Sequence, residues 1–205
     1  MNATKPLVEH VIGTQYDDLS TTAITAAKTF FLDTLGVSIA GTAAPFAAQL
    51  RQTVNHWGAS PEASVLGLDD QFPAANAALI NGFHAHCQEF DCIHEAAIVH
   101  PLASIQSAVL AWCEAYTHRT GKLISGQQLI LALCLGVDVS TSIGMAANNG
   151  LRFFIFSRLG PWLHRGVQGG FSCLAARGGG SDHLSFYDTL HTITVQWKTI
   201  SHISG

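Results

Sequence analysis

The sequence predicts an all-α protein folded as a helical bundle, and three observations support this fold class. Apolar residues recur at steps of three and four along most of residues 20–145, which is the period of an amphipathic helix. Glycine and proline stand between these periodic segments, where helices commonly end and begin. This part of the chain has no series of alternating strands and no internal repeat at a fixed period.

The first two predicted helices are separated by a glycine and a proline. The first begins at Ser20 and ends at Gly41, a residue type that favours a helix C-terminus. The second begins near Pro45, which suits a first turn, and ends at Gly58. The apolar face of the first helix is expected to consist of Ile24, Ala27, Phe31, Leu35 and Ile39.

Three further helices are predicted beyond a short strand or extended connector at residues 63–66. The first is rich in alanine and runs from near Pro73 to about Phe83. The next buries a face that repeats at helical spacing. The last starts at a capping box formed by Ser125 and Gln128 and extends toward Met145. The two faces expected to be buried are Ile105, Ala108, Val109, Trp112 and Tyr116, then Leu129, Ile130, Leu133, Cys134 and Val137.

Composition narrows the class of protein further. The chain has 205 residues, of which 48% are hydrophobic and 12% charged, so it is long enough and apolar enough for one substantial core. A net charge of -4 without a basic stripe predicts no nucleic-acid partner. The longest apolar runs, such as 129–137, are shorter than the roughly 20 residues of a membrane-spanning helix, so no membrane partner is predicted. The high content of apolar residues indicates an oligomer interface in addition to the core, and we expect a homodimer.

The expected location is the cytoplasm. The five cysteines are odd in number, widely spread and set mostly among apolar residues, which is typical of free thiols in a reducing compartment. The N-terminal segment contains His10, Asp17 and Asp18 and has no uninterrupted apolar region of the kind found in secretory signals.

Two parts are predicted along the chain. Residues 1–154 form the helical domain, and residues 155–205 form a glycine-rich tail of different character. The run Gly178-Gly179-Gly180 breaks any helix, and the threonine and valine residues near the C-terminus favour strand.

The segment from Asn81 to His100 contains most of the groups that could transfer protons. Histidines and carboxylates act as acids and bases near neutral pH when their surroundings tune them, and this segment holds several of each. The alternative interpretation is that these residues cap or connect helices, with Asp91 or Glu95 solvated. The candidate acids and bases are His86, Glu89, Asp91, His94 and His100.

A metal site in the same segment is the second alternative. Imidazole and thiolate groups bind zinc, but the spacing of His84, His86, Cys87, Cys92 and His94 matches no common zinc pattern. Two histidines separated by one residue on a helix point away from each other. We therefore predict no metal ligands, and a metal-dependent hydrolase built on His84, His86 and His94 is the weaker interpretation.

Three motifs together resemble the MmgE/PrpD family, which includes 2-methylcitrate dehydratase, cis-aconitate decarboxylase and iminodisuccinate epimerase. Asp33-Thr34-Leu35-Gly36 with Ala40-Gly41 looks like the family's D-x-x-G helix. Asn81-Gly82, His86 and Glu89-Phe90-Asp91-Cys92 are similar to N-G-x-x-x-H-x-x-D-F-D-D, and His100-Pro101-Leu102-Ala103 is similar to H-P-S-A. Gly144-Met145 to Arg152 resembles the segment that leads toward the family's next active-site region. The resemblance covers about residues 7–154.

The resemblance implies the large helical domain of a two-domain, usually dimeric enzyme that acts on small di- or tricarboxylates without a metal or organic cofactor. Glu89, Asp91 and His100 would abstract or deliver protons, and His86 and Arg152 are expected to bind the substrate. Cys92 and Ile93 depart from the family pattern. The lysine-bearing segments and the α/β lid of the family would lie beyond Phe154, where this sequence differs.

The leading interpretation is therefore a truncated member of this family, with an altered tail from a frameshift, a misread intron or gene decay. The expected parent activity is that of a dehydratase or related lyase, and we expect this chain to lack it when unaided. An interaction protein without catalytic activity is the alternative. It would pair through its apolar helices with itself or with a full-length homologue.

Overall fold

The computed structural model describes residues 4–58 and 60–146. Within these residues the predicted all-α class is confirmed, because every element except one pair of very short strands is helical. In chain order the elements are α1 (Thr4–Gly13), η1 (Tyr16–Asp18), α2 (Thr21–Gly41), α3 (Ala47–Asn55), β1 (Ala63–Ser64), β2 (Gln71–Phe72), α4 (Ala74–His86), α5 (Pro101–Thr120) and α6 (Gly126–Ala146).

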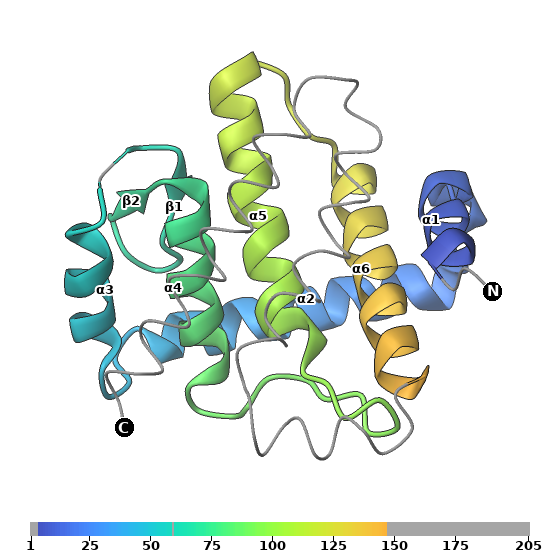
Figure 1. Ribbon diagram of the computed structural model, residues 1–205, viewed down its shortest axis with the longest axis horizontal. Helices are drawn as coiled ribbons and strands as arrows, with labels where there is room; N and C mark the ends of the chain where they lie inside the picture. The colour runs from blue at the N-terminus through green and yellow to red at the C-terminus, as the bar shows by residue number, and fades with distance from the viewer. Residues whose placement is uncertain (1–3, 59, 147–205) are drawn as a thin grey trace.

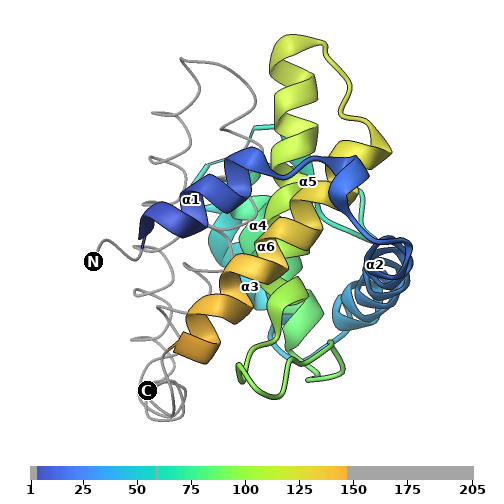
Figure 2. The ribbon, with the colours of Figure 1, turned by 90° about the vertical axis from the view of Figure 1, so that its right-hand side faces the viewer.

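Helices α4, α5 and α6 stand side by side as one layer, and α2 crosses the back of this layer (Figure 1). Figure 2 views α2 almost along its axis and shows it on the outer side of the other three helices. Helix α5 packs most extensively against α4, and α2 also contacts all three members of the layer. Helix α3 and the strand pair lie beside α4, whereas α1 packs on α6 through Val11.

The helix termini confirm several predictions from local sequence. The Ser20 hydroxyl accepts a hydrogen bond from the Ala23 N–H at 3.1 Å, which caps α2 where a helix start was predicted. The predicted capping box before α6 is present. The Ser125 N–H donates to Gln128 Oε1 at 2.8 Å, and the Gln128 N–H donates to Ser125 Oγ at 3.2 Å. Short-range chemistry therefore set these boundaries.

The predicted apolar face of α5 forms the centre of the bundle. Ile105, Ala108, Val109 and Trp112 are buried, and the Tyr116 ring stacks on Trp112 with 4.9 Å between ring centroids. They pack against α6 residues of the same cluster, among them Ala132 and Leu133. Apolar burial of this kind is the main favourable term in folding, which explains why the periodic pattern predicted α5 well.

The buried side of α2 overlaps the predicted apolar face, but its most deeply buried residues are others. Its fully buried residues are the small residues Thr34, Ser38 and Gly41, whereas Ile39 is exposed. A side-chain carbon added at Gly41 would overlap the main-chain oxygen of His84. The two backbones approach this closely only because the residues between them are small, and sequence periodicity does not encode such a crossing. The rest of the predicted face, Ile24, Ala27, Phe31 and Leu35, is half-buried.

The outward side of α2 remains apolar. Leu32 is 71% exposed, and Phe30 and Ile39 are also exposed. By length and hydropathy alone, α2 and α6 are the two helices of the described part that could cross a membrane, although core helices of soluble proteins can pass the same test. In the apolar 18-residue stretch of each helix, 44% of the residues of α6 are buried inside the protein but only 11% of those of α2.

The extended connector predicted at residues 63–66 is present as β1 and its continuation. Strand β1 pairs antiparallel with β2, with Ala63 opposite Phe72. The buried Asn81 side chain fixes the connector to α4 by accepting from the Leu66 N–H at 2.9 Å and donating to the Ser64 carbonyl at 3.0 Å. The asparagine of the N-G motif therefore has a structural role here. The predicted tail 155–205 lies outside the described residues.

Candidate active site

The candidate site lies where α4 ends and α5 begins, at one end of the helical layer. Helix α4 ends at His86, three residues beyond the predicted end, and α5 begins at Pro101 directly after His100. The segment 87–100 connects the two helices. It folds back so that Asp91 contacts both His86 and His100. The end of α4, the start of α5 and the segment between them thus bring His86, Asp91 and His100 together.

Asp91 is the centre of the cluster. The Nδ1 atom of His86 lies 3.1 Å and 3.2 Å from the two carboxylate oxygens of Asp91. The Nδ1 atom of His100 lies 3.3 Å from Asp91 Oδ1 and 3.3 Å from the Asp91 main-chain oxygen. The two imidazole rings meet edge to face with their centroids 4.9 Å apart. One carboxylate is therefore shared by two imidazoles.

Burial differs sharply within the cluster. The Asp91 side chain is 0% exposed, whereas the His86 and His100 side chains are 38% and 30% exposed. Asp91 is therefore not solvated, whereas Glu95, the other residue named in the alternative, is exposed. A fully buried carboxylate requires hydrogen-bond donors. The His86 ring supplies one, and the His100 ring lies within ion-pair distance of Oδ1 while hydrogen-bonding the Asp91 main-chain oxygen.

The environment favours the charged form of His86. The hydrogen bond to Asp91 is the largest cause that raises the pKa of His86, and the negative charges of Asp91 and Glu89 act in the same direction. Partial burial opposes them by lowering the pKa, but the net shift is upward. His86 is thus suited to remain a cation at a higher pH than an ordinary histidine.

The backbone of the connecting segment is unusual at two positions. Glu89 and Ile98 both have a φ of 53°, in the left-handed region that non-glycine residues rarely adopt. Reciprocal backbone hydrogen bonds between His94 and Val99, at 2.8 Å and 3.3 Å, close a tight loop before His100. Such strained positions are frequent near functional sites, although strain alone does not identify one.

Helix α6 supports this loop from the other side. A side-chain carbon added at Gly144 would lie 2.7 Å from the Ala97 side chain, so only glycine permits this approach. Gly144 belongs to the third motif of the sequence. In the described structure its visible role is to let α6 contact the loop that ends at His100.

The remaining predicted site residues are placed as follows. Glu89 is exposed, and its carboxylate takes part in no hydrogen bond or ion pair within the described range, so its catalytic role stays a prediction. His94 accepts a hydrogen bond from the Ala97 N–H through its Nδ1 atom at 3.1 Å, which is a structural contact. Arg152, predicted to bind substrate, lies outside the described residues.

The metal site kept as the weaker alternative, His84 with His86 and His94, is not assembled in the described residues. His84 is fully buried on α4, whereas His86 is partly exposed, as expected for residues two apart on a helix. Among residues 4–58 and 60–146, the group that could hold a metal ion is His86, Asp91 and His100, whose ligand atoms all lie within 4.8 Å of one another.

The sequence did not reveal that His86 contacts Asp91. His86 was predicted to bind substrate, whereas in the structure its Nδ1 faces the carboxylate. The available signal was the position of His86 in the last turn of a helix, five residues before an aspartate in a short connection. This spacing becomes informative only when the path of the connection is known.

The fold and the site define an all-α domain that presents two imidazoles and a shared carboxylate at one end of its helical layer. A family model described as the MmgE/PrpD N-terminal domain matches residues 5–197. The chain therefore belongs to the MmgE/PrpD family. The matched residues extend beyond position 154, where the sequence predicted a change of character.

Two similar proteins illustrate the relationship. A cis-aconitate decarboxylase-like protein of Aspergillus oryzae is 25% identical over 147 residues, which cover 71% of this chain and 30% of that protein. A cis-aconitate decarboxylase of Aspergillus terreus is 27% identical over 130 residues, which cover 63% of this chain and 26% of that protein. The chain thus spans less than a third of the length of these relatives.

Proposed function

We propose that this chain supplies the helical part of a lyase or isomerase that transfers protons on small di- or tricarboxylates without a metal or organic cofactor. The observation that carries the proposal is the contact of His100 with the buried Asp91 carboxylate. The family membership and the names of the two Aspergillus relatives support the reaction class. They make cis-aconitate the first substrate to test.

The chemistry requires a base or acid beside the reacting carbon and a cation beside the substrate carboxylate. In dehydration, His100 takes the proton from the carbon next to a carboxylate, and the hydroxyl group leaves as water after receiving a proton. In decarboxylation, the carbon–carbon bond breaks, carbon dioxide leaves, and a proton replaces it on the carbon. A cationic His86 pairs with a substrate carboxylate in either reaction, and the exposed Glu89 is the candidate second acid.

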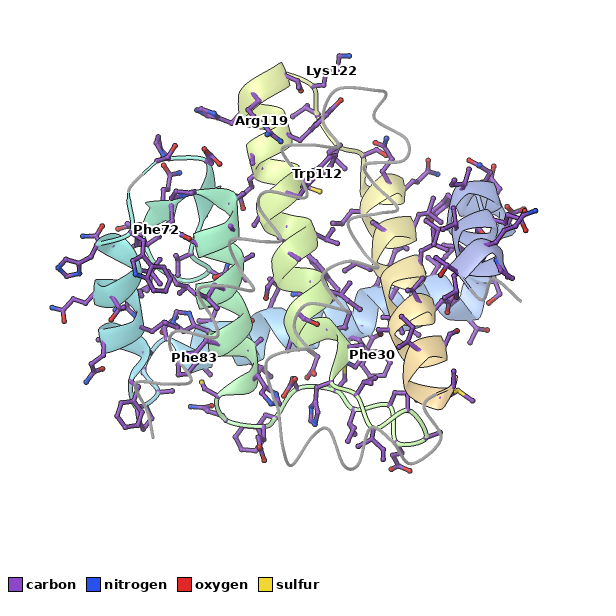
Figure 3. All side chains as sticks on the ribbon, viewed as in Figure 1. Phe30, Phe72, Phe83, Trp112, Arg119 and Lys122 are labelled. Atoms are coloured by element: carbon purple, nitrogen blue, oxygen red, sulfur yellow. The ribbon has the colours of Figure 1, made fainter. Side chains whose placement is uncertain are left out.

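Two basic residues near the end of α5 lie far from this cluster. Figure 3 labels Arg119 and Lys122 at the opposite end of α5 from Pro101. A helix of 20 residues is about 30 Å long at 1.5 Å per residue. Arg119 and Lys122 are therefore too distant to hold a substrate at His100, and His86 is the cation that the described site offers.

The test combines substrate binding with turnover. Purified full chain, free of host enzymes, is mixed with cis-aconitate or 2-methylcitrate, while ring signals of His86 and His100 and product formation are followed by NMR. We expect both rings to respond to cis-aconitate, and His100→Gln to abolish any turnover. His56→Gln is the matched control because His56 is exposed at the end of α3. No response of either ring and no product with any tested acid would contradict the proposal.

The second candidate function is self-association through α2, and the exposed apolar side of this helix favours it. Leu32 and Ile39 lie seven residues apart, so they occupy one stripe, and the intervening Gly36 leaves open space because no heavy atom lies within 4 Å of its added carbon. Small residues in such a stripe allow close helix approach. The proposed occupant is α2 of a second copy, as in a homodimer.

Leu32→Glu tests this interface. A buried charge would oppose association, so we expect the protein to change from dimer to monomer in analytical ultracentrifugation. Leu123→Glu is the matched control because Leu123 is also exposed but lies after α5. A monomeric parent protein, or equal behaviour of the two variants, would refute the dimer. Binding of the parent protein to lipid vesicles that Leu32→Glu abolishes would assign the stripe to a membrane instead.

A further inference from the structure

The arrangement around Asp91 defines which ring nitrogens are available for chemistry. The Nδ1 atom of His100 faces two oxygens of Asp91, one main-chain carbonyl and one carboxylate. The Nδ1 atom of His86 faces both oxygens of the same carboxylate. Carbonyl and ionised carboxylate oxygens accept hydrogen bonds and cannot donate them. Each Nδ1 must therefore carry its proton.

This leaves the Nε2 atoms of both rings for a ligand. Neither Nε2 has a hydrogen-bond partner within the part of the chain that the structure describes, and neither belongs to the buried unpartnered atoms found there. Both therefore reach the surface in this part of the chain. A neutral imidazole with its proton on Nδ1 has a free electron pair on Nε2 and can accept a proton there.

Asp91 itself is poorly placed to touch a substrate. Its side chain is 0% exposed, and it lies behind the two rings that contact it. A carboxylate in this position orients imidazoles and stabilises their positive charge, as in other aspartate–histidine pairs. This role differs from the direct proton transfer predicted for Asp91 from the sequence.

Charged groups act on His86 and on Cys92, which lies next to the cluster. Asp91 and Glu89 belong to the segment 87–100, and both act on His86. Burial is the largest cause that raises the pKa of the neighbouring Cys92 thiol, and the charges of Asp91 and of Asp33 in α2 act in the same direction against weaker backbone hydrogen bonds. The acidic neighbours therefore favour the cationic form of His86, which is the form that can pair with a carboxylate ligand.

We propose that Asp91 is a positioning residue that holds His86 and His100 as a pair, with both Nε2 atoms facing outward to bind one small carboxylate ligand. His86 donates from Nε2 to the ligand carboxylate, and His100 presents the unprotonated Nε2 to the adjacent carbon. The inference rests on the proposed function for the identity of the ligand class, but the ring geometry can be tested without turnover.

The first experiment reads the protonated nitrogen directly in the full chain. Histidine rings labelled with ¹⁵N distinguish Nδ1–H from Nε2–H by their nitrogen shifts. We expect neutral His100 to carry its proton on Nδ1 and His86 to titrate above an ordinary histidine. Asp91→Asn should move the His86 titration downward and leave that of the exposed His56 unchanged. A neutral His100 protonated on Nε2, or no response of His86 to Asp91→Asn, would overturn the proposal.

The second experiment measures ligand binding with citrate as a non-reacting tricarboxylate probe. His86→Gln should weaken citrate binding about tenfold, as expected for the loss of one charged hydrogen bond. The control His56→Gln should leave binding unchanged, and circular dichroism identifies any variant that fails to fold. Equal citrate affinity of the parent and His86→Gln would refute the paired site. Citrate binding with the predicted His86 dependence but no turnover of any acid would uphold the pair and refute the proposed reaction.

A bound metal is the competing explanation of the same three residues. Elemental analysis of the gently purified chain distinguishes a metal site from the proposed histidine pair. A stoichiometric divalent cation that removes both Nδ1–H signals would overturn the positioning role, because both nitrogens would then be ligands. Metal-free protein with both Nδ1–H signals intact supports the proposal.

Discussion

His84 and His86 are separated by one residue at the end of α4, yet they occupy opposite environments. His84 is fully buried, and neither of its ring nitrogens has a hydrogen-bond partner among the described residues. Burial, with a smaller contribution from the charge of Arg51, lowers the pKa of His84 from 6.5 to about 4. His86 is partly exposed, contacts Asp91, and has a raised pKa.

The difference shows that the partner, more than the residue type, decides what a histidine does. Two positions apart on a helix, the side chains point to different sides, so the His84 ring is buried within the bundle and the His86 ring meets the connecting segment. Burial without a partner keeps His84 neutral, while a carboxylate favours the cation at His86. His84 therefore belongs to the packing of the bundle, and His86 belongs to the candidate site.

Among the substitutions considered, Gly41→Ala is expected to lower the free energy of unfolding most, because it disturbs the buried contact beside His84. The added carbon would overlap the main chain of His84, which cannot move without shifting α4. We expect a loss of about 3 kcal/mol in the free energy of unfolding, at the upper end for overpacking. Urea unfolding measures this loss.

Gly36→Ala is the matched control in the same helix. The added carbon at Gly36 meets no heavy atom within 4 Å. Alanine is the better helix former, so we expect this variant to gain about 0.5 to 1 kcal/mol. Equal stability of the two variants would show that α2 does not approach α4 as described.

The pH dependence of stability tests whether His84 is held neutral in the folded protein. The pKa of His84 is lower in the folded protein, so below pH 6.5 the unfolded chain binds a proton that the folded chain does not. Stability should therefore fall as the pH drops from 6.5 to about 4, by up to about 3 kcal/mol for a shift of this size.

His84→Leu removes the titrating group and places an apolar side chain at the buried position. We expect a smaller loss of stability between pH 7 and pH 4.5 in this variant than in the parent protein. Urea unfolding at the two pH values measures both. Parallel losses in the two proteins would assign the acid sensitivity to other groups.

Asp91→Asn is expected to have the smallest effect on stability, and in the opposite pH range. The raised pKa of His86 means that its stabilising contribution is complete below pH 6.5 and is lost as the pH rises through the folded-state pKa. We expect the variant to lose about 1 kcal/mol at pH 6, because a charged hydrogen bond is removed from a partly exposed group. The loss should be smaller at pH 9.

The exposed His56 provides the control for this measurement. His56→Gln should change stability by less than about 0.5 kcal/mol at either pH, as is usual for surface substitutions. A loss in Asp91→Asn that is the same at pH 6 and pH 9 would mean that the His86 charge does not contribute to it.

The sequence predicted the features that depend on neighbours along the chain. The capping box at Ser125 and the buried face of α5 follow from short-range hydrogen bonds and from helical periodicity. The small, fully buried positions of α2 could not be predicted in this way. They depend on a crossing with α4 that is set by Gly41 and by a residue far along the chain.

The candidate site was predicted in composition but not in geometry. Helical spacing indicated that His84 and His86 face different sides, but it could not say which side is the interior. The burial of Asp91 depends on how the segment 87–100 folds back, and its positive φ at Glu89 has no glycine signal in the sequence. The pairing of His86 with Asp91 therefore required the structure.

The contact between Gly144 and Ala97 has a consequence for how this chain can be divided. Gly144 lies in the last turn of α6, yet it supports a loop that ends at His100. A fragment cut before Gly144 would retain most helices of the bundle but lose the support of this loop. The shortest piece of the chain that preserves the described site must therefore extend past Gly144.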